Sequence, residues 1–245
     1  MAEPKIIYED KNFLAINKPA GLLVHKTAVS KEPTLTDWVI KKYPEIITVG
    51  DPSAQSGQIN LRPGVVHRLD KDTSGVILIA RNQKYFHYLK GLFQNHEIKK
   101  MYLALTKGKI KSEKGIIEKP IGIKPGTTKR TVFGGKMAKE AVTAYEVAGR
   151  YEYPKTKEIF SLISASPKTG RTHQIRIHMS SLGHPLVGDP LYGKKKNPFG
   201  LERQFLHAKS LEFKSDGQKT LKIEAEIPED LKNILNKLKP LNSGD

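Results

Sequence analysis

Residues 65–80 read VVHRLDKDTSGVILIA, and this stretch places a polar turn between two apolar segments. Val65 and Val66 come before the turn, and residues 76–80 follow it as a continuous apolar run with the length of a buried strand. Asp, Thr, Ser and Gly occur together in the middle, which favours a tight turn. The stretch therefore predicts a strand that enters the core directly after a turn carrying ionisable side chains on rigid flanks.

The two aspartates of this turn, Asp70 and Asp72, admit more than one interpretation. As a pair they resemble glycosidase carboxylates, but side chains at i and i+2 diverge in a turn, so their spacing does not decide the question. Carboxylates in turns often accept hydrogen bonds from backbone N–H groups. From the residues alone, a turn-forming role for Asp70 is favoured over catalysis. We expect Asp72, Thr73 and Ser74 to shape the turn and Leu69 to pack inward.

The chain is strongly basic, and its charge is unevenly distributed. Its 245 residues include 42 Lys and Arg against 25 Asp and Glu, a formal net charge of +17. Residues 99–139 hold twelve Lys and Arg and two acids, a net +10. Glycines and prolines interrupt this segment, so we expect loops and a β-hairpin with a positive face. Such an excess of positive charge indicates a polyanionic partner, with nucleic acid as the first candidate.

Several classes of protein and site are disfavoured. The chain has no cysteine, which removes disulfides and cysteine-ligated zinc and fits a cytoplasmic protein. It has no membrane-length apolar run and no signal-peptide pattern, so we expect no membrane association. His173 and His178 lie outside any H-E-x-x-H motif, so we expect no metal and only local hydrogen bonds for His173. Residues 188–194, GDPLYGK, approach a P-loop, but Lys195 stands where a Ser or Thr is required.

The order of the expected elements indicates an α+β fold. Strands are expected at residues 5–10, 12–19, 75–80, 100–110, 141–151, 158–166, 204–213 and 219–228, and helices at 34–44, 82–97, 172–183 and 229–239. Because strands often follow one another directly, we expect a mixed, mostly antiparallel sheet with flanking helices. We expect one domain over residues 1–240, a loop at residues 50–64, and a disordered tail at residues 241–245.

Four motifs occur along the chain in a fixed order. HRLD at residues 67–70 is followed by TSG, and then come KMYLA at 100–104, GRTHQIRIH at 170–178 and GHPLVGDPLYG at 183–193. Together they resemble the motifs of the RluA family of RNA pseudouridine synthases, and the similarity of pattern runs from about residue 6 to residue 238. A match to four motifs in the same order is strong evidence for the family, whereas a match to H-R-L-D alone would be weak evidence. The resemblance implies the pseudouridine synthase fold, with a central catalytic cleft.

The resemblance also implies a reaction, the isomerisation of uridine to pseudouridine in RNA. In that family the base detaches from C1′ through N1, turns, and reattaches through C5, without a metal or cofactor. The family's aspartate falls on Asp70, which must be ionised either to add to C1′ or to remove the C2′ proton. Its salt-bridging arginine, the cation that would keep Asp70 ionised, falls on Arg176. Its aromatic residue, which stacks on the target base, falls on Tyr102.

The same resemblance implies an RNA surface. Arg68 corresponds to the arginine that enters the duplex when the target nucleotide flips out, a step that costs free energy. Phosphate contacts from the basic segment would offset that cost. The remaining candidates for RNA contact are His67, Arg171, Lys119, Lys124, Lys129 and Arg130.

The sequence says less about the RNA substrate, the domain content and the oligomeric state of the protein. The family pattern begins almost at the first residue, so we expect a compact member without the N-terminal S4 RNA-binding domain, acting as a monomer on large-subunit ribosomal RNA. One alternative is modification of tRNA. A second is a catalytically inactive RNA-binding or ribosome-assembly module on the same fold. A third is a different N-glycosidic enzyme, which would release free uracil.

Overall fold

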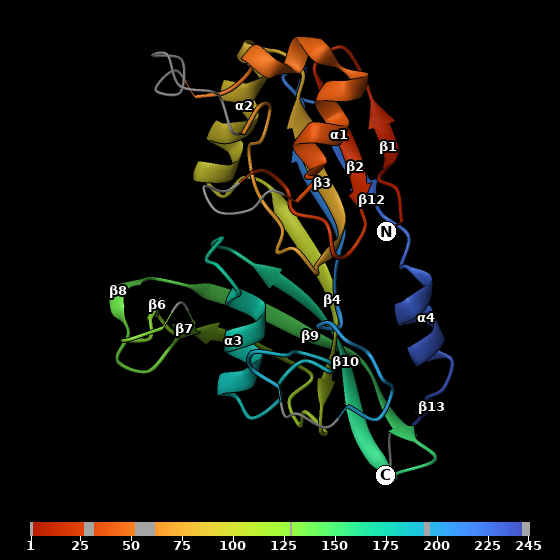
Figure 1. Ribbon diagram of the computed structural model, residues 1–245. Helices are drawn as coiled ribbons and strands as arrows, with labels where there is room; N and C mark the ends of the chain where they lie inside the picture. The colour runs from red at the N-terminus through yellow and green to blue at the C-terminus, as the bar shows by residue number, and fades with distance from the viewer. Residues whose placement is uncertain (1, 27–31, 52–61, 128, 194–196, 242–245) are drawn as a thin grey trace. The chain divides into compact units, whose positions relative to one another are not determined.

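The computed structural model describes residues 2–26, 32–51, 62–127, 129–193 and 197–241 (Figure 1). The chain divides into two compact units. Unit 1 comprises residues 1–99 and 208–226, and unit 2 comprises residues 100–207 and 227–245. The chain passes between the units three times: within β4 (Lys99–Lys107), within β11 (Leu206–Lys214) and after residue 226. Both units combine antiparallel strands with helices, which confirms the predicted α+β class.

Unit 1 is built on a sheet whose central strand is the apolar run of the opening stretch. The strands follow the order β1 (Lys5–Glu9), β2 (Phe13–Lys18), β3 (Ser74–Ala80), β11 and β12 (Thr220–Glu224). β2 pairs antiparallel with both β1 and β3. All seven residues of β3 are buried, which explains why its sequence is apolar without alternation. The expected strand is therefore confirmed.

The helices of unit 1 begin where the sequence predicts. α1 (Leu35–Lys42) starts with a capping box, in which Thr34 and Asp37 satisfy each other's backbone N–H groups. A 3-10 helix follows at Pro44–Thr48. α2 (Gln83–Gln94) starts at the cap residue Asn82 and buries an apolar stripe consisting of Tyr85, Phe86, Leu89 and Leu92.

Unit 2 contains a second set of strands with a helix on each face. The order is β4, β10 (Glu158–Pro167), β9 (Val142–Tyr153) and β13 (Lys239–Pro240), and β5 (Lys114–Glu118) also pairs with β9. Neighbouring residues of a strand point to opposite faces. Ala104 packs in a cluster with α3 (Gln174–Ser181), whereas Leu105 packs in a cluster with α4 (Glu229–Leu235). Figure 1 shows α3 lying across β9 and β10.

A small separate sheet in unit 2 carries much of the basic segment. Its order is β7 (Arg130–Thr131), β6 (Ile121–Ile123) and β8 (Lys136–Lys139), with antiparallel pairing throughout. We call residues 119–140 the basic arm. The sequence predicted loops and a hairpin, and the structure adds a third short strand. Gly122 and Gly135 permit this, because a side chain on either would lie within 2.8 Å of the other's backbone.

The C-terminal segment contains a short strand that was not expected. β13 was not predicted, and Leu241 follows it with a hydrogen bond from its N–H to the Arg150 carbonyl. Most of the loop expected at residues 50–64, and of the tail expected at 241–245, lies outside the described residues. In the described part of the chain, no helix is long and apolar enough to cross a membrane.

Candidate functional site

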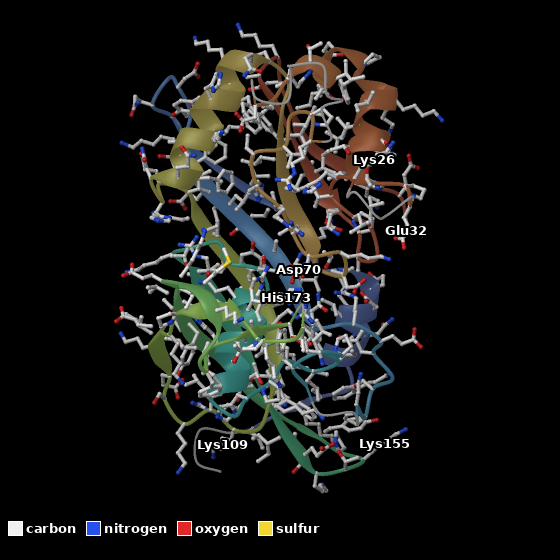
Figure 2. All side chains as sticks on the ribbon, turned by 60° about the vertical axis from the view of Figure 1, so that its left-hand side comes forward. Lys26, Glu32, Asp70, Lys109, Lys155 and His173 are labelled. Carbon is white, nitrogen blue, oxygen red and sulfur yellow. The ribbon has the colours of Figure 1, made fainter. Side chains whose placement is uncertain are left out.

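The turn that carries Asp70 is closed by backbone hydrogen bonds. The Thr73 N–H donates to the Asp70 carbonyl at 3.1 Å, and the Gly21 N–H donates to the Lys71 carbonyl at 3.0 Å. Asp70 is half-buried, and Figure 2 labels it among the side chains of unit 1. Leu69 beside it is buried with 4% exposure, which confirms that it packs. The polar turn is thus held to the 18–22 segment on one side and to β3 on the other.

A buried lysine strengthens this attachment. The Lys18 side chain is fully buried, and its Nζ donates to the carbonyls of Pro19, Leu22 and Lys71 at 2.8, 2.8 and 2.9 Å. Three carbonyl acceptors match the three N–H bonds of an ammonium group, so the buried charge is well solvated by the protein. The Lys71 bond fixes the residue directly after Asp70. Sequence reasoning missed Lys18, because a single lysine at the end of a strand carries no distinctive signal.

The other end of the turn enters β3 through a special glycine. Gly75 has φ +116°, and a Cβ at this position would lie 2.7 Å from the backbone carbon and nitrogen of Ala208. Thr73 and Ser74 before it are 2% and 1% exposed. Both residues are thus buried where the turn enters the strand, and their role in shaping the turn stays a prediction. Asp70 therefore projects from a turn whose flanks have little freedom to move.

The residues directly before the turn include a stacked histidine and an exposed arginine. The His67 ring stacks on Phe93 with 4.3 Å between ring centroids, and its Nε2 accepts the Leu78 N–H. His67 therefore has a packing role, and its contact with RNA stays a prediction. Arg68 is exposed. Burial lowers the pKa of His25; its hydrogen bond to the Lys26 carbonyl opposes this effect, while the charges of Arg62 and Arg68 add to it.

In unit 2, Tyr102 lies on the face of the sheet that α3 covers. Tyr102 pairs with Ala165 across β4 and β10, and its half-buried ring packs against the cluster that contains Ile175 and Met179 of α3. Arg176 lies on the same helix. The structure therefore brings two of the predicted site residues, Tyr102 and Arg176, to one face of one sheet.

Arg176 forms a buried ion pair with Asp189. Its Nε and Nη2 donate to the two carboxylate oxygens at 2.7 and 2.8 Å, and the two side chains are 4% and 0% exposed. Burial by itself would raise the pKa of Asp189. The hydrogen bonds and charge of Arg176, together with two backbone N–H groups, outweigh burial and hold this pKa below its usual range. The planar guanidinium suits this two-point contact.

The loop that resembled a P-loop is organised by the same carboxylate. Asp189 Oδ1 also accepts the N–H groups of Leu191 and Tyr192 at 2.9 and 3.0 Å. A carboxylate that accepts N–H groups two and three residues ahead is common turn chemistry. The backbone N–H groups of the GDPLYG loop therefore bind the carboxylate of Asp189, where those of a P-loop would bind a phosphate. Sequence analysis treated Asp189 only as part of a motif and missed its pairing with Arg176.

Residues of α3 and of the segment directly before it bond to both ends of the basic arm. At one end, the His178 Nε2 bonds to the Lys119 carbonyl at 3.0 Å, and Lys119 Nζ donates to Ser181 Oγ at 3.3 Å. At the other end, the Arg171 Nε donates to the Glu140 carbonyl at 2.9 Å. Burial lowers the pKa of His178, the Lys119 carbonyl opposes this effect, and the Lys119 charge adds to it. The contacts of Arg171 and Lys119 with RNA stay predictions.

The outer surface of the arm is basic and carries two unburied apolar side chains. Phe133 and Met137 are 72% and 76% exposed. The exposed lysines of the arm are Lys124, Lys129, Lys136 and Lys139, and Arg130 is half-buried. Exposed aromatic rings among cations are typical of surfaces that bind single-stranded nucleic acid, because a base can stack on the ring while lysines contact phosphates. Among the residues that the structure describes, no cluster of His, Asp and Glu has an arrangement that would hold a metal ion.

Comparison with known proteins gives a single family. The family model described as RNA pseudouridylate synthase matches residues 12–181. The chain is 39% identical over 192 residues to an RNA pseudouridine synthase of Aquifex aeolicus, covering 78% of this chain and 57% of that protein. It is 35% identical to the ribosomal large subunit pseudouridine synthase D of Buchnera aphidicola, covering 95% of this chain and 72% of that protein.

A solved structure supports the same assignment. Human RNA pseudouridylate synthase domain containing 1 superimposes with a TM-score of 0.77 at 25% identity, covering 98% of this chain and 89% of that one. The chain therefore belongs to the RNA pseudouridylate synthase family, as its four motifs indicated. It spans a little over half of the Aquifex relative's length and about three quarters of the Buchnera relative's.

Proposed function

We propose that the protein is an RNA pseudouridine synthase that isomerises specific uridines of large-subunit ribosomal RNA. Membership of the family supports the reaction class. The Buchnera relative is named a ribosomal large subunit pseudouridine synthase, which supports ribosomal RNA as the substrate. The observation that carries the proposal is the turn at Asp70, where an acidic side chain projects from a segment held by Lys18 and by the entry into β3. We further propose that the protein acts as a monomer in the cytoplasm.

Within this proposal, each site residue has one task. Asp70 attacks C1′ or removes the C2′ proton, and rigid flanks keep it oriented for the reaction. Tyr102 stacks on the target base, and Arg176 is the cation of the site. Arg68 enters the RNA duplex at the position that the flipped nucleotide leaves. Arg171, Lys119, Lys124, Lys129 and Arg130 of unit 2, and His67 of unit 1, are the candidate contacts with the rest of the RNA.

The decisive experiment replaces Asp70 with Asn. This change keeps the size of the side chain but removes its negative charge and its nucleophilic or basic oxygen. Pseudouridine formation breaks the C5–H bond of uridine, so turnover is measured as tritium release from RNA that carries 5-tritiated uridine. RNA binding is measured by titration on the same preparation. We expect Asp70→Asn to bind RNA within a few-fold of wild type and to release no detectable tritium.

A matched control lies two residues away. Asp72→Asn makes the same chemical change in the same turn, and we expect it to keep substantial turnover. Tritium release by Asp70→Asn at nearly the wild-type rate would refute the assignment of Asp70. Wild-type release from tRNA and not from ribosomal RNA would change the substrate. Binding without release on either RNA would favour an inactive RNA-binding module, and free uracil among the products would indicate a hydrolase.

A further inference from the structure

One hydroxyl group of unit 2 lies between the basic arm and α3. The Tyr192 Oη accepts the backbone N–H of Arg130 at 3.1 Å, and it also bonds to the His173 Nδ1 at 2.9 Å. A phenol oxygen can take part in both bonds at once, because it has two acceptor sites and one donor. Arg130 begins β7 of the arm, and His173 is the cap residue at the start of α3. Tyr192 therefore bridges these two elements.

The rest of Tyr192 contacts the Arg176–Asp189 pair. Its backbone N–H donates to Asp189 Oδ1 at 3.0 Å. The Arg176 guanidinium carbon lies over its ring, 5.3 Å from the centroid, a distance at which a cation and an aromatic face attract each other. The ring also packs against the small apolar cluster formed by Ile121, Ala141 and Ile177. The Tyr192 side chain thus contacts the arm at its hydroxyl and through Ile121, and its ring also contacts Arg176.

The position of this bridge in the arm gives it a particular role. The contacts of Lys119 with α3 and of Glu140 with Arg171 hold the two ends of the arm, whereas Tyr192 holds β7 between them. β7 follows the exposed Lys129 and contains Arg130, so RNA phosphates that bind these cations act on the strand that Tyr192 holds. His173 has φ +59° with no side-chain cap, a backbone conformation that depends on its surroundings.

We propose that Tyr192 is a positioning residue that couples the binding of RNA on the basic arm to the orientation of Arg176. RNA bound to the arm holds β7 in place, and β7 in turn holds the Tyr192 hydroxyl through the Arg130 N–H. The Tyr192 ring and backbone N–H then hold Arg176 and Asp189 in their orientation. This inference rests on the proposed function, since it assigns the arm to RNA and Arg176 to the reaction. It predicts that an RNA long enough to reach the arm is converted with a higher kcat than a short one.

The test uses Tyr192→Phe, which keeps the ring over Arg176 and the N–H to Asp189 and removes only the hydroxyl contacts. Steady-state tritium release is measured on a short stem-loop and on a longer fragment of the same RNA. The wild-type advantage of the long RNA in kcat/KM should fall by about two- to tenfold, the worth of a hydrogen bond or two. Part of this loss should appear in kcat, and the short RNA should be unaffected.

Two further variants make the result specific. Tyr88→Phe removes a hydroxyl that donates to the Lys214 carbonyl in unit 1, and this identical change should leave both RNAs unaffected. His173→Asn removes the other partner of the Tyr192 hydroxyl with a residue that tolerates positive φ, and it should reproduce the effect of Tyr192→Phe. Melting temperatures identify any variant that loses activity through unfolding.

The possible outcomes separate this inference from the proposed function. An equal loss on both RNAs would show a merely structural role, and a loss confined to KM would show arm binding without coupling. An unchanged advantage of the long RNA in Tyr192→Phe and in His173→Asn would also overturn the proposal. Wild type that releases no tritium from any RNA would refute the proposed function. In that case, the ratio of the affinities for long and short RNA in the same variants still tests whether Tyr192 holds the arm in the position that binds RNA.

Discussion

The buried pair of Arg176 and Asp189 shows how much depends on one residue. A carboxylate with no exposure is costly to bury, and this cost is offset only while two guanidinium N–H groups and two backbone N–H groups bond to it. Loss of either partner leaves the other charge buried and unpaired. Arg176 is also the proposed cation of the site, so its effect on activity has to be separated from its effect on stability.

We expect Arg176→Ala to destabilise the fold by about 3–5 kcal/mol at neutral pH. In wild type, the folded-state pKa of Asp189 is lowered, so the pair contributes stability above the pKa of the unfolded chain and loses it as the pH falls. In the variant, burial without the arginine raises that pKa, so folding takes up a proton. The deficit in melting temperature against wild type should therefore be largest at pH 7.5 and smaller at pH 4.5.

A second bidentate pair supplies the control for this experiment. Arg203 donates to Asp230 through the same two nitrogens at 2.7 and 3.1 Å, but the Asp230 side chain is 45% exposed. Water can solvate Asp230 when its partner is removed, so Arg203→Ala should show a smaller deficit that changes little with pH. A deficit for Arg176→Ala that stays constant over this pH range would contradict the account of the buried charge.

At the scale of the element, β3 depends on a backbone conformation that only glycine adopts easily. Gly75→Ala places a methyl group against the Ala208 backbone at positive φ, whereas Gly91→Ala in α2 meets nothing within 4 Å. We expect Gly75→Ala to lower the melting temperature by several degrees or more. Gly91→Ala should raise it by about 2–4 °C, since alanine favours helix by about 1 kcal/mol. Thermal unfolding of the two variants checks this, and a neutral Gly75→Ala would show that β3 can shift.

The elements that the sequence predicted well have local signals. Thr34 and Asp37 mark the start of α1, and the unbroken apolar run marks β3 as a buried strand. The arm and β13 lacked such signals, because strands of two to four residues are too short to show a hydrophobic period, and β13 also depends on pairing with the distant strand β9. The same reason explains the site residues that were missed. The partners of Lys18 and Tyr192 lie as many as 53 and 62 residues away.

At the scale of the whole molecule, the dominant property is the net charge of +17. We expect the affinity for RNA to fall linearly with the logarithm of salt concentration, because phosphate contacts release counterions. Simultaneous replacement of Lys124, Lys129 and Arg130 with Ala should reduce the slope by about two to three and leave the melting temperature nearly unchanged. Titrations at several salt concentrations measure this slope.

The control for the salt experiment removes the same charge from another part of the chain. Lys11, Lys41 and Lys84 are exposed lysines of unit 1, and their replacement with Ala lowers the net charge equally. If the basic arm carries the phosphate contacts, this control should change the slope by less than one. Equal changes of the slope in the two triple variants would mean that RNA affinity depends on the total charge of the protein and that the arm makes no particular contribution.

The outer edge of β9 is covered by two short strands from distant parts of the chain. β5 pairs with residues 142–146 and β13 with residues 151–152, and the Leu241 N–H reaches the Arg150 carbonyl at 2.9 Å. An uncovered edge of this length would offer its free N–H and C=O groups to a strand of a second molecule, the usual first step of aggregation. The few residues after α4 thus cover part of an edge that would otherwise be open to such pairing, although they lie outside the residues that the family model matches.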